Sequence, residues 1–107
     1  MTPENVSAII DTVKGTVLPS ERIAMFNKAC AIDPHDTVII EELSELIKAV
    51  SKINRCHNNK HLKSLMEEIA DVRIVIERIM HKYNIKEDDI DKLVVFKINR
   101  FIDRYGI

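Results

Sequence analysis

The sequence predicts an all-α fold: an antiparallel helical hairpin core with flanking N- and C-terminal helices, and a bundle completed by oligomerisation. Only two glycines and three prolines occur in 107 residues, which leaves few breaks between helices. Apolar residues recur at steps of three and four over most of the chain, which is the spacing of one helix face. No linker, repeat or change of composition divides the chain. Residues 1–107 are therefore expected to form one domain.

The overall charge and composition argue against several classes of protein. Sixteen basic and seventeen acidic residues give a net charge of -1, so no general field should attract nucleic acid or an anionic membrane. No apolar run approaches the roughly 20 residues of a membrane span, and residues 1–4 do not resemble the start of a signal peptide. Cys30 and Cys56 lack the spacing of a zinc site or a disulfide framework. We therefore expect a cytoplasmic protein with no nucleic-acid or membrane partner.

Helix start and stop signals divide the chain into five expected helices. The signals are cap residues, prolines at the first helical position and acids in the first turn. The clearest of them is Asp33-Pro34, and Asn59 is the expected cap of the helix that follows the short turn after Arg55. The expected helices span about residues 2–17, 20–31, 33–55, 59–83 and 87–106.

The helices at residues 33–55 and 59–83 should form the hairpin, because so short a connection folds two helices back antiparallel. Their apolar stripes are Ile39, Leu43, Leu46, Val50 and Ile53 in the first, and Leu65, Ile69, Val72, Ile76, Ile79 and Tyr83 in the second. Further apolar residues lie outside these stripes, namely Val38, Ile40, Ile47, Ile74 and Val75. This surplus, and the small core of so short a chain, predict a homodimer or homotetramer.

Each helix of the expected hairpin carries two carboxylates three residues apart. They are Glu42 and Glu45 in the first helix, and Glu68 and Asp71 in the second. Glu42 and Glu45 lie three and six residues after Ile39, and Glu68 and Asp71 lie three and six residues after Leu65. Both pairs are therefore expected on the same side of the apolar stripe of their helix. The midpoint in sequence between the two pairs falls in the turn after Arg55. Folding at this turn should therefore bring all four carboxylates to the same level along the two helices and to the same edge of the hairpin.

Four carboxylates gathered on one edge raise one another's pKa values unless a cation neutralises them. Hard oxygen ligands favour Mg²⁺, with Mn²⁺ as a possible substitute, and bound Mg²⁺ commonly shares its coordination with substrate phosphates. The pattern therefore predicts a metal site for phosphate chemistry. The alternative is a non-enzymatic helical interaction module, in which the acids form a solvated face or bind a basic partner.

Basic residues that could contact phosphate follow the acidic pairs. Lys97, Arg100 and Arg104 lie at i, i+3 and i+7 on one face of the last expected helix, where they can hold a triphosphate chain. Lys52 and Arg55, beyond the first acidic pair, are further candidates. The competing interpretation for all five is an exposed basic residue near a helix C-terminus, where the helix dipole favours positive charge.

At the acidic pairs the chain resembles the MazG-like, all-α nucleoside triphosphate pyrophosphohydrolases, in the short single-domain form found in bacteria and their phages. The family signature ExxE, spacer, ExxD reads Glu42-Leu43-Ser44-Glu45 and Glu68-Ile69-Ala70-Asp71, with residues 46–67 as the spacer. The resemblance covers roughly residues 35–105. It implies that Glu42, Glu45, Glu68 and Asp71 bind Mg²⁺, and that a nucleoside triphosphate is hydrolysed to its monophosphate and pyrophosphate.

The resemblance also implies that a metal-activated water attacks the α-phosphorus, with Glu41 and Glu45 as the candidates for the catalytic base. Such an activity serves nucleotide pool cleansing or regulation. Family members often carry a glutamine or aromatic residues ahead of the first acidic pair, whereas this chain has His35, Asp36 and Thr37 there. The preferred base and sugar therefore stay open. A second enzymatic alternative is the hydrolysis of phosphoribosyl-ATP, which related helical folds perform.

Overall fold

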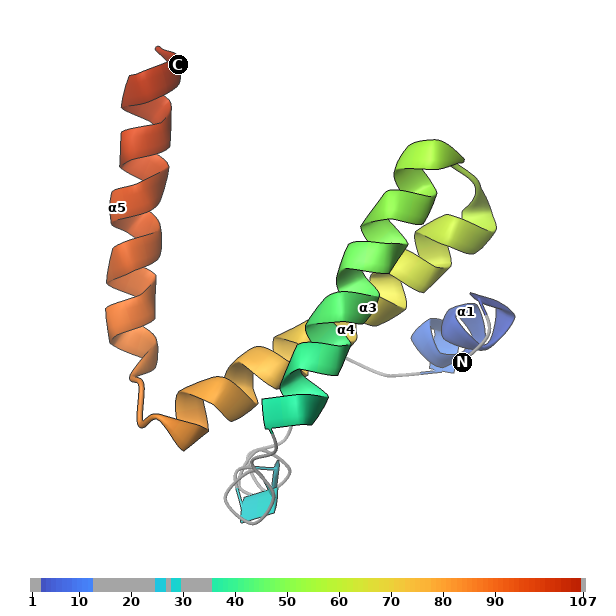
Figure 1. Ribbon diagram of the computed structural model, residues 1–107, viewed down its shortest axis with the longest axis horizontal. Coiled ribbons are helices and arrows are strands. Elements are labelled where there is room, and N and C mark those ends of the chain that lie inside the picture. The colour runs from blue at the N-terminus through green and yellow to red at the C-terminus, as the bar shows by residue number, and fades with distance from the viewer. Residues whose placement is uncertain (1–2, 13–24, 27, 30–35, 107) are drawn as a thin grey trace.

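The computed structural model of the protein describes residues 3–12, 25–26, 28–29 and 36–106, and all regular secondary structure in these residues is helical. Four described helices have defined bounds (Figure 1). They are α1 (Pro3–Thr12), α3 (Asp36–Arg55), α4 (Asn59–Lys82) and α5 (Glu87–Tyr105). The prediction of an all-α fold is confirmed.

The N-terminal predictions are only partly covered by the described residues. α1 begins at Pro3, the expected first helical position, but its predicted extension to residue 17 lies outside the described residues. The bounds of the helix expected at residues 20–31 also lie outside them, although residues 25–26 and 28–29 are helical. The start signal Asp33-Pro34 is likewise not covered, whereas α3 ends at Arg55, as predicted.

The turn between α3 and α4 is closed by local hydrogen bonds. The side chain of Asn58 caps α4, because its Oδ1 accepts a hydrogen bond from the backbone N–H of His61 at 2.7 Å. In the same turn, His61 Nδ1 donates to the backbone oxygen of Cys56 at 2.6 Å. The predicted cap, Asn59, was wrong by one position, since Asn59 is the first residue of α4.

The turn between α4 and α5 contains a left-handed asparagine. Asn84 has a φ of 53°, and the N–H of Ile85 donates to the backbone oxygen of Met80 at 2.8 Å. Together with the bond from the Asn84 N–H to the His81 oxygen, this is a Schellman motif, which satisfies the last carbonyls of α4. The break that the sequence predicts at residues 84–86 therefore has a defined geometry.

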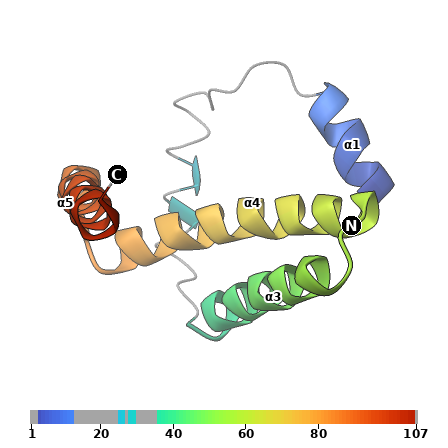
Figure 2. The same cartoon turned by 90° about the horizontal axis from the view of Figure 1, so that it is seen from above.

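α3 and α4 lie side by side and run in opposite directions, and α1 packs against α4 (Figures 1 and 2). The buried apolar side chains of the described residues come from these three helices. They are Val6, Ile39, Ala49, Val72, Val75 and Met80. Val75 lies outside the predicted stripes, yet it is the least exposed of these residues at 3%.

About half of the predicted stripes remains on the outside of the helix pair. Leu43 and Val50 on α3 are 37% and 42% exposed, and Ile69 and Ile76 on α4 are 42% and 45% exposed. Two helices cover each other along one side only, so apolar residues on the flank of the contact stay in water. In one chain the pair therefore has an uncovered apolar flank.

α5 turns away from the end of α4 and packs against none of the other described helices (Figures 1 and 2). It has no buried residue, and large apolar side chains such as Phe101 and Tyr105 are 56% and 65% exposed. The radius of gyration is 16.5 Å, compared with about 13 Å for a compact domain of about this length. Within the described residues, no helix combines the length and apolarity needed to cross a membrane.

Candidate functional site

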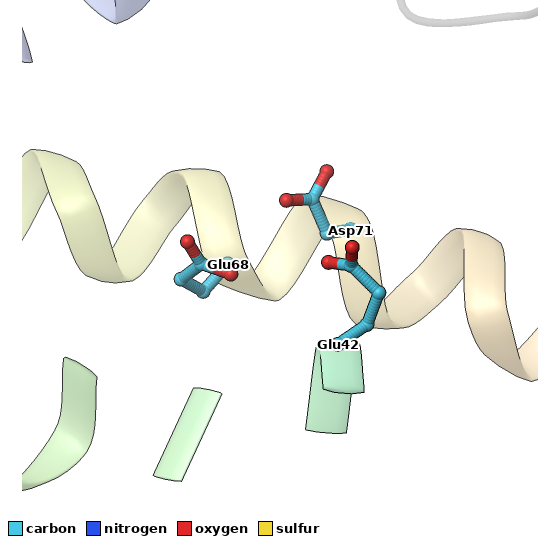
Figure 3. Close-up of side chains that lie close together, drawn as sticks. All are labelled: Glu42, Glu68 and Asp71. Carbon is cyan, nitrogen blue, oxygen red and sulfur yellow. The ribbon is translucent and has the colours of Figure 1, made fainter. Parts of the chain in front are cut away.

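Three of the four predicted carboxylates converge at the contact between α3 and α4. Glu42 extends from α3 toward Asp71 on α4, and Glu68 lies about one turn earlier on α4 (Figure 3). One oxygen from each carboxylate lies within 4.8 Å of the other two. The buried side chains of Ile39, one turn before Glu42, and Val72, next to Asp71, fix the two backbones at this level.

The cluster is electrostatically unfavourable for a protein without a bound cation. Partial burial raises the pKa of Glu42 above its ordinary value, and the nearby charges of Asp71, Glu41 and Glu45 raise it further. The pKa of Glu68 is also raised, first by burial and then by Asp71, Glu42 and other neighbouring acids. Both carboxyls are therefore held in surroundings that favour either a proton or a metal ion.

The Glu68 carboxylate contains the site's clearest unsatisfied atom. Its Oε2 is buried and has no hydrogen-bond partner within the described part of the chain. A buried acceptor without a partner costs free energy, so native proteins usually pair such atoms with a donor, a water or an ion. In the same described part, no ion pair joins a basic side chain to Glu42, Glu68 or Asp71.

The donor set fits a small hard cation. Mg²⁺ binds oxygen at about 2.0–2.1 Å in octahedral geometry, so adjacent ligands lie about 3 Å apart and opposite ligands about 4.2 Å apart. The 4.8 Å limit on the oxygens of Glu42, Glu68 and Asp71 is wider than either spacing, so rotations of these side chains must bring the oxygens closer when they bind one ion. Three carboxylates that form no ion pair with a basic side chain of the described residues match the chemistry of Mg²⁺ or Mn²⁺.

Glu45, the fourth predicted ligand, is not part of this cluster. Its Oε1 pairs with Lys48 Nζ at 3.3 Å, and the Lys48 side chain is largely exposed whereas that of Glu45 is about half-buried. Its negative charge nevertheless contributes to the raised pKa values of Glu42 and Glu68, so it lies near the cluster. Glu41, the other predicted catalytic residue, is exposed on α3 and adds to the raised pKa of Glu42.

The basic residues of α3 lie farther along the hairpin. Lys52 follows Glu45 by seven residues, which places it on the same face about 10 Å away along the axis. Arg55 is the last residue of α3, almost one turn further toward the link to α4. Both side chains are exposed. Lys52 is therefore the nearer of the two to the carboxylate cluster.

The basic residues of α5 are not brought to the carboxylates within one chain. Lys97, Arg100 and Arg104 are exposed on a helix that contacts neither α3 nor α4. The guanidinium of Arg100 instead lies 5.8 Å from the ring centroid of Phe96 on the same helix. The two halves of the predicted phosphate site are thus separate in a single copy.

The sequence reasoning missed an apolar cleft between α1 and α4. Its volume is about 380 Å³, and we call it the α1–α4 cleft. It is lined by Val6, Ile9, Ile10, Met66, Glu67, Ala70 and Asp71, so one cluster carboxylate also forms part of its wall. The available signal was the pair Ile9 and Ile10, since only one side of a short helix can be covered by α4.

The described site therefore combines convergent carboxylates on the hairpin with an adjoining apolar cleft. Glu42, Glu68 and Asp71 can hold a divalent cation, and Asp71 links them to the α1–α4 cleft. No protein-family model, curated protein or solved structure matches the chain.

Proposed function

We propose that the protein is a Mg²⁺-dependent hydrolase that converts a nucleoside triphosphate to its monophosphate and pyrophosphate. The observation that carries this proposal is the convergence of Glu42, Glu68 and Asp71 from two helices, with Glu68 Oε2 buried and without a hydrogen-bond partner among the described residues. A cluster of this kind is costly unless a cation binds it. The resemblance of the two acidic pairs to the MazG-like signature supports the same reaction.

In this proposal Glu42, Glu68 and Asp71 would hold the cation with their carboxylate oxygens. Bound Mg²⁺ supplies Lewis-acid polarisation of phosphoryl oxygens and lowers the pKa of a water molecule. The protein must present its carboxylates ionised, and the raised pKa values of Glu42 and Glu68 mean that protons compete with the metal at acidic pH. Glu45 would be a fourth ligand if its carboxylate turned from Lys48 to the cation.

The remaining acidic and basic residues have roles around this centre. The attacking water would give its proton to Glu41 or Glu45, whose negative charges both act on Glu42. Lys52, two turns beyond Glu45, neutralises the outer phosphates, and Arg55 adds a second positive charge in the last turn of α3. These residues orient the phosphate chain so that its α-phosphorus lies next to the carboxylates.

The proposal includes a second copy of the chain. α5 exposes apolar side chains from Leu93 to Tyr105 and packs against no other described helix, and the pair of helices α3 and α4 has an uncovered apolar flank. Packing α5 against another copy buries this surface and carries the basic residues of α5 to the partner's carboxylates. Lys97, Arg100 and Arg104 then bind the triphosphate in a homodimer or homotetramer.

A pyrophosphate-release assay with Mg²⁺ and a panel of canonical and modified nucleoside triphosphates tests the proposed reaction. We expect the wild type to release pyrophosphate from at least one of them. Glu42→Gln and Asp71→Asn should lower kcat/KM by 100-fold or more, because each removes a ligand charge. Glu77→Gln is the matched control, since Glu77 is an exposed acid on α4 outside the cluster, and its rate should equal that of the wild type.

The same panel separates the alternatives. Turnover of phosphoribosyl-ATP alone would favour the second enzymatic activity, and survival of every triphosphate would favour a non-enzymatic interaction module. Comparing Glu41→Gln with Glu45→Gln identifies the base. Replacing the catalytic base should lower kcat and leave the metal affinity unchanged, whereas replacing a metal-binding carboxylate should lower both kcat and the metal affinity.

A further inference from the structure

The α1–α4 cleft has the size and position of a binding site beside the carboxylates. Its volume of about 380 Å³ falls within the range of about 300–1,000 Å³ that small-molecule pockets occupy. Asp71 lines this cleft and also contributes an oxygen to the cluster with Glu42 and Glu68. A molecule held at the cluster can therefore extend directly into the cleft.

The side chains that line the cleft offer apolar contact and no hydrogen-bond donor. Val6, Ile9, Ile10, Met66 and Ala70 are apolar, and the remaining two, Glu67 and Asp71, are carboxylates that only accept when ionised. The negative charge is confined to these two residues of α4. Such a lining suits a flat, uncharged group and disfavours a phosphate or a carboxylate, which the two acids would repel.

Resting on the proposed function, we infer that the α1–α4 cleft binds the nucleobase of the triphosphate substrate by apolar contact. In a nucleotide, one sugar ring separates the base from the α-phosphate. The base must therefore lie next to the carboxylate cluster, and the α1–α4 cleft adjoins the cluster at Asp71. The exposed faces of Ile10 and Met66, 54% and 42% accessible, become covered when the base enters.

This assignment specifies the substrate class. Strong discrimination between similar ligands requires buried polar groups that lose their partners when the wrong ligand binds, whereas apolar pockets discriminate weakly. The described lining side chains contain no hydrogen-bond donor, and the two acceptors, Glu67 and Asp71, are only partly buried, so neither is a buried polar group that loses its partner when another base binds. The substrates are therefore nucleoside triphosphates as a class, with the four common bases binding within about tenfold of one another.

Calorimetric titration with non-hydrolysable ligands tests the assignment without relying on turnover. The probes are the α,β-methylene triphosphates of adenosine, guanosine, cytidine and uridine, and methylenediphosphonate as the ligand without a nucleoside, all with Mg²⁺. Ile10→Asn should weaken binding of the four nucleotides by about five- to tenfold and change that of methylenediphosphonate less than twofold. Met66→Gln, which keeps the side-chain length, should act in the same direction.

Leu62→Asn is the matched control, because Leu62 is 37% exposed on α4, does not line the cleft and lies outside the apolar residues assigned to contacts with a second copy. Its affinities should match those of the wild type. The inference is overturned if the wild type binds nucleotides no tighter than methylenediphosphonate, if Ile10→Asn and Met66→Gln leave nucleotide binding unchanged, or if one base is preferred by 100-fold or more. If the wild type binds the four nucleotides more tightly than methylenediphosphonate but releases no pyrophosphate from any triphosphate, the proposed reaction is refuted and the cleft assignment stands.

Discussion

The carboxylates of Glu42 on α3 and Asp71 on α4 approach each other across the helix pair, and one oxygen of Glu42 lies within 4.8 Å of one oxygen of Asp71 (Figure 3). Two like charges at this separation disfavour the packed hairpin, and Glu68 adds a third. The stability of the metal-free protein should therefore increase when one of these charges is removed.

Glu68→Gln is the substitution that tests this electrostatic cost. Glutamine keeps the shape of the side chain and removes its charge, so we expect the melting temperature in EDTA at pH 7 to rise by about 2–4 °C. Glu77→Gln, outside the cluster, should change the melting temperature by less than about 1 °C, because substitutions of exposed residues usually have little effect on stability. Differential scanning calorimetry makes the comparison, and a lower melting temperature for Glu68→Gln would contradict the expected cost.

The pH dependence of the metal-free protein follows from the same two carboxyls. The pKa values of Glu42 and Glu68 are raised above 4.5, so the folded state binds protons more tightly than the unfolded state in the window just above that value. The contribution of these groups to stability is therefore greatest at acidic pH and falls as pH rises through the window. In urea unfolding with EDTA, the free energy of unfolding should fall less steeply with rising pH for Glu68→Gln than for the wild type. Equal slopes for the two proteins would contradict the assignment of this pH dependence to Glu68.

The start of α4 depends on one asparagine. Asn58 Oδ1 accepts from the His61 N–H at 2.7 Å, so Asn58→Ala should lower the free energy of unfolding by about 1 kcal/mol. Asn59→Ala is a demanding control, because Asn59 is the neighbouring residue and the cap that the sequence favoured. It should change stability by less than about 0.5 kcal/mol. Urea denaturation distinguishes the two, and equal losses would place the cap elsewhere.

The proposed role of α5 in a second copy predicts the mass in solution. Light scattering should give two or four times the chain mass of 12.3 kDa for the wild type. Phe101→Asp, which places a charge on an exposed apolar position of α5, should shift the protein toward the monomer. A wild type that is monomeric at micromolar concentration would contradict the proposed assembly.

Subunit mixing then tests whether α5 acts on the partner's site. Asp71→Asn and Arg100→Ala should each be inactive alone. In a mixed dimer, one site receives both substitutions and the other receives neither, so an equal mixture should recover about a quarter of the wild-type activity. No recovery after confirmed subunit exchange would place Arg100 in the same subunit's site or outside any site.

The helical architecture could be predicted because its determinants are local. The three- and four-residue spacing of apolar residues in α3 and α4, and the turn after Arg55, sufficed to identify both helices. The register of Glu42 against Glu68 and Asp71 followed from the same periodicity, because the midpoint of an antiparallel pair fixes which levels meet. The cap was misplaced by one residue, since Asn58 and Asn59 have the same side chain and spacing alone does not choose between them.

The rest of the site depends on packing that the sequence pattern does not specify. Glu45 lies on the predicted flank but turns to Lys48, because a flexible side chain takes an available partner within one turn. The α1–α4 cleft depends on where α1 crosses α4, which periodicity does not determine. The position of α5 was also not predictable, since an apolar helix face can be covered by its own chain or by another copy.

Mn²⁺ binding, measured by electron paramagnetic resonance of the free ion during a titration at pH 7.5, tests most directly whether the converging carboxylates form a metal centre. We expect the wild type to remove Mn²⁺ from solution and Mg²⁺ to displace it. Glu42→Gln, Glu68→Gln and Asp71→Asn should each weaken binding by about tenfold or more, while Glu77→Gln binds as the wild type does. A wild type that binds no Mn²⁺, or binding that survives all three substitutions, would contradict the metal centre and the hydrolytic function built on it.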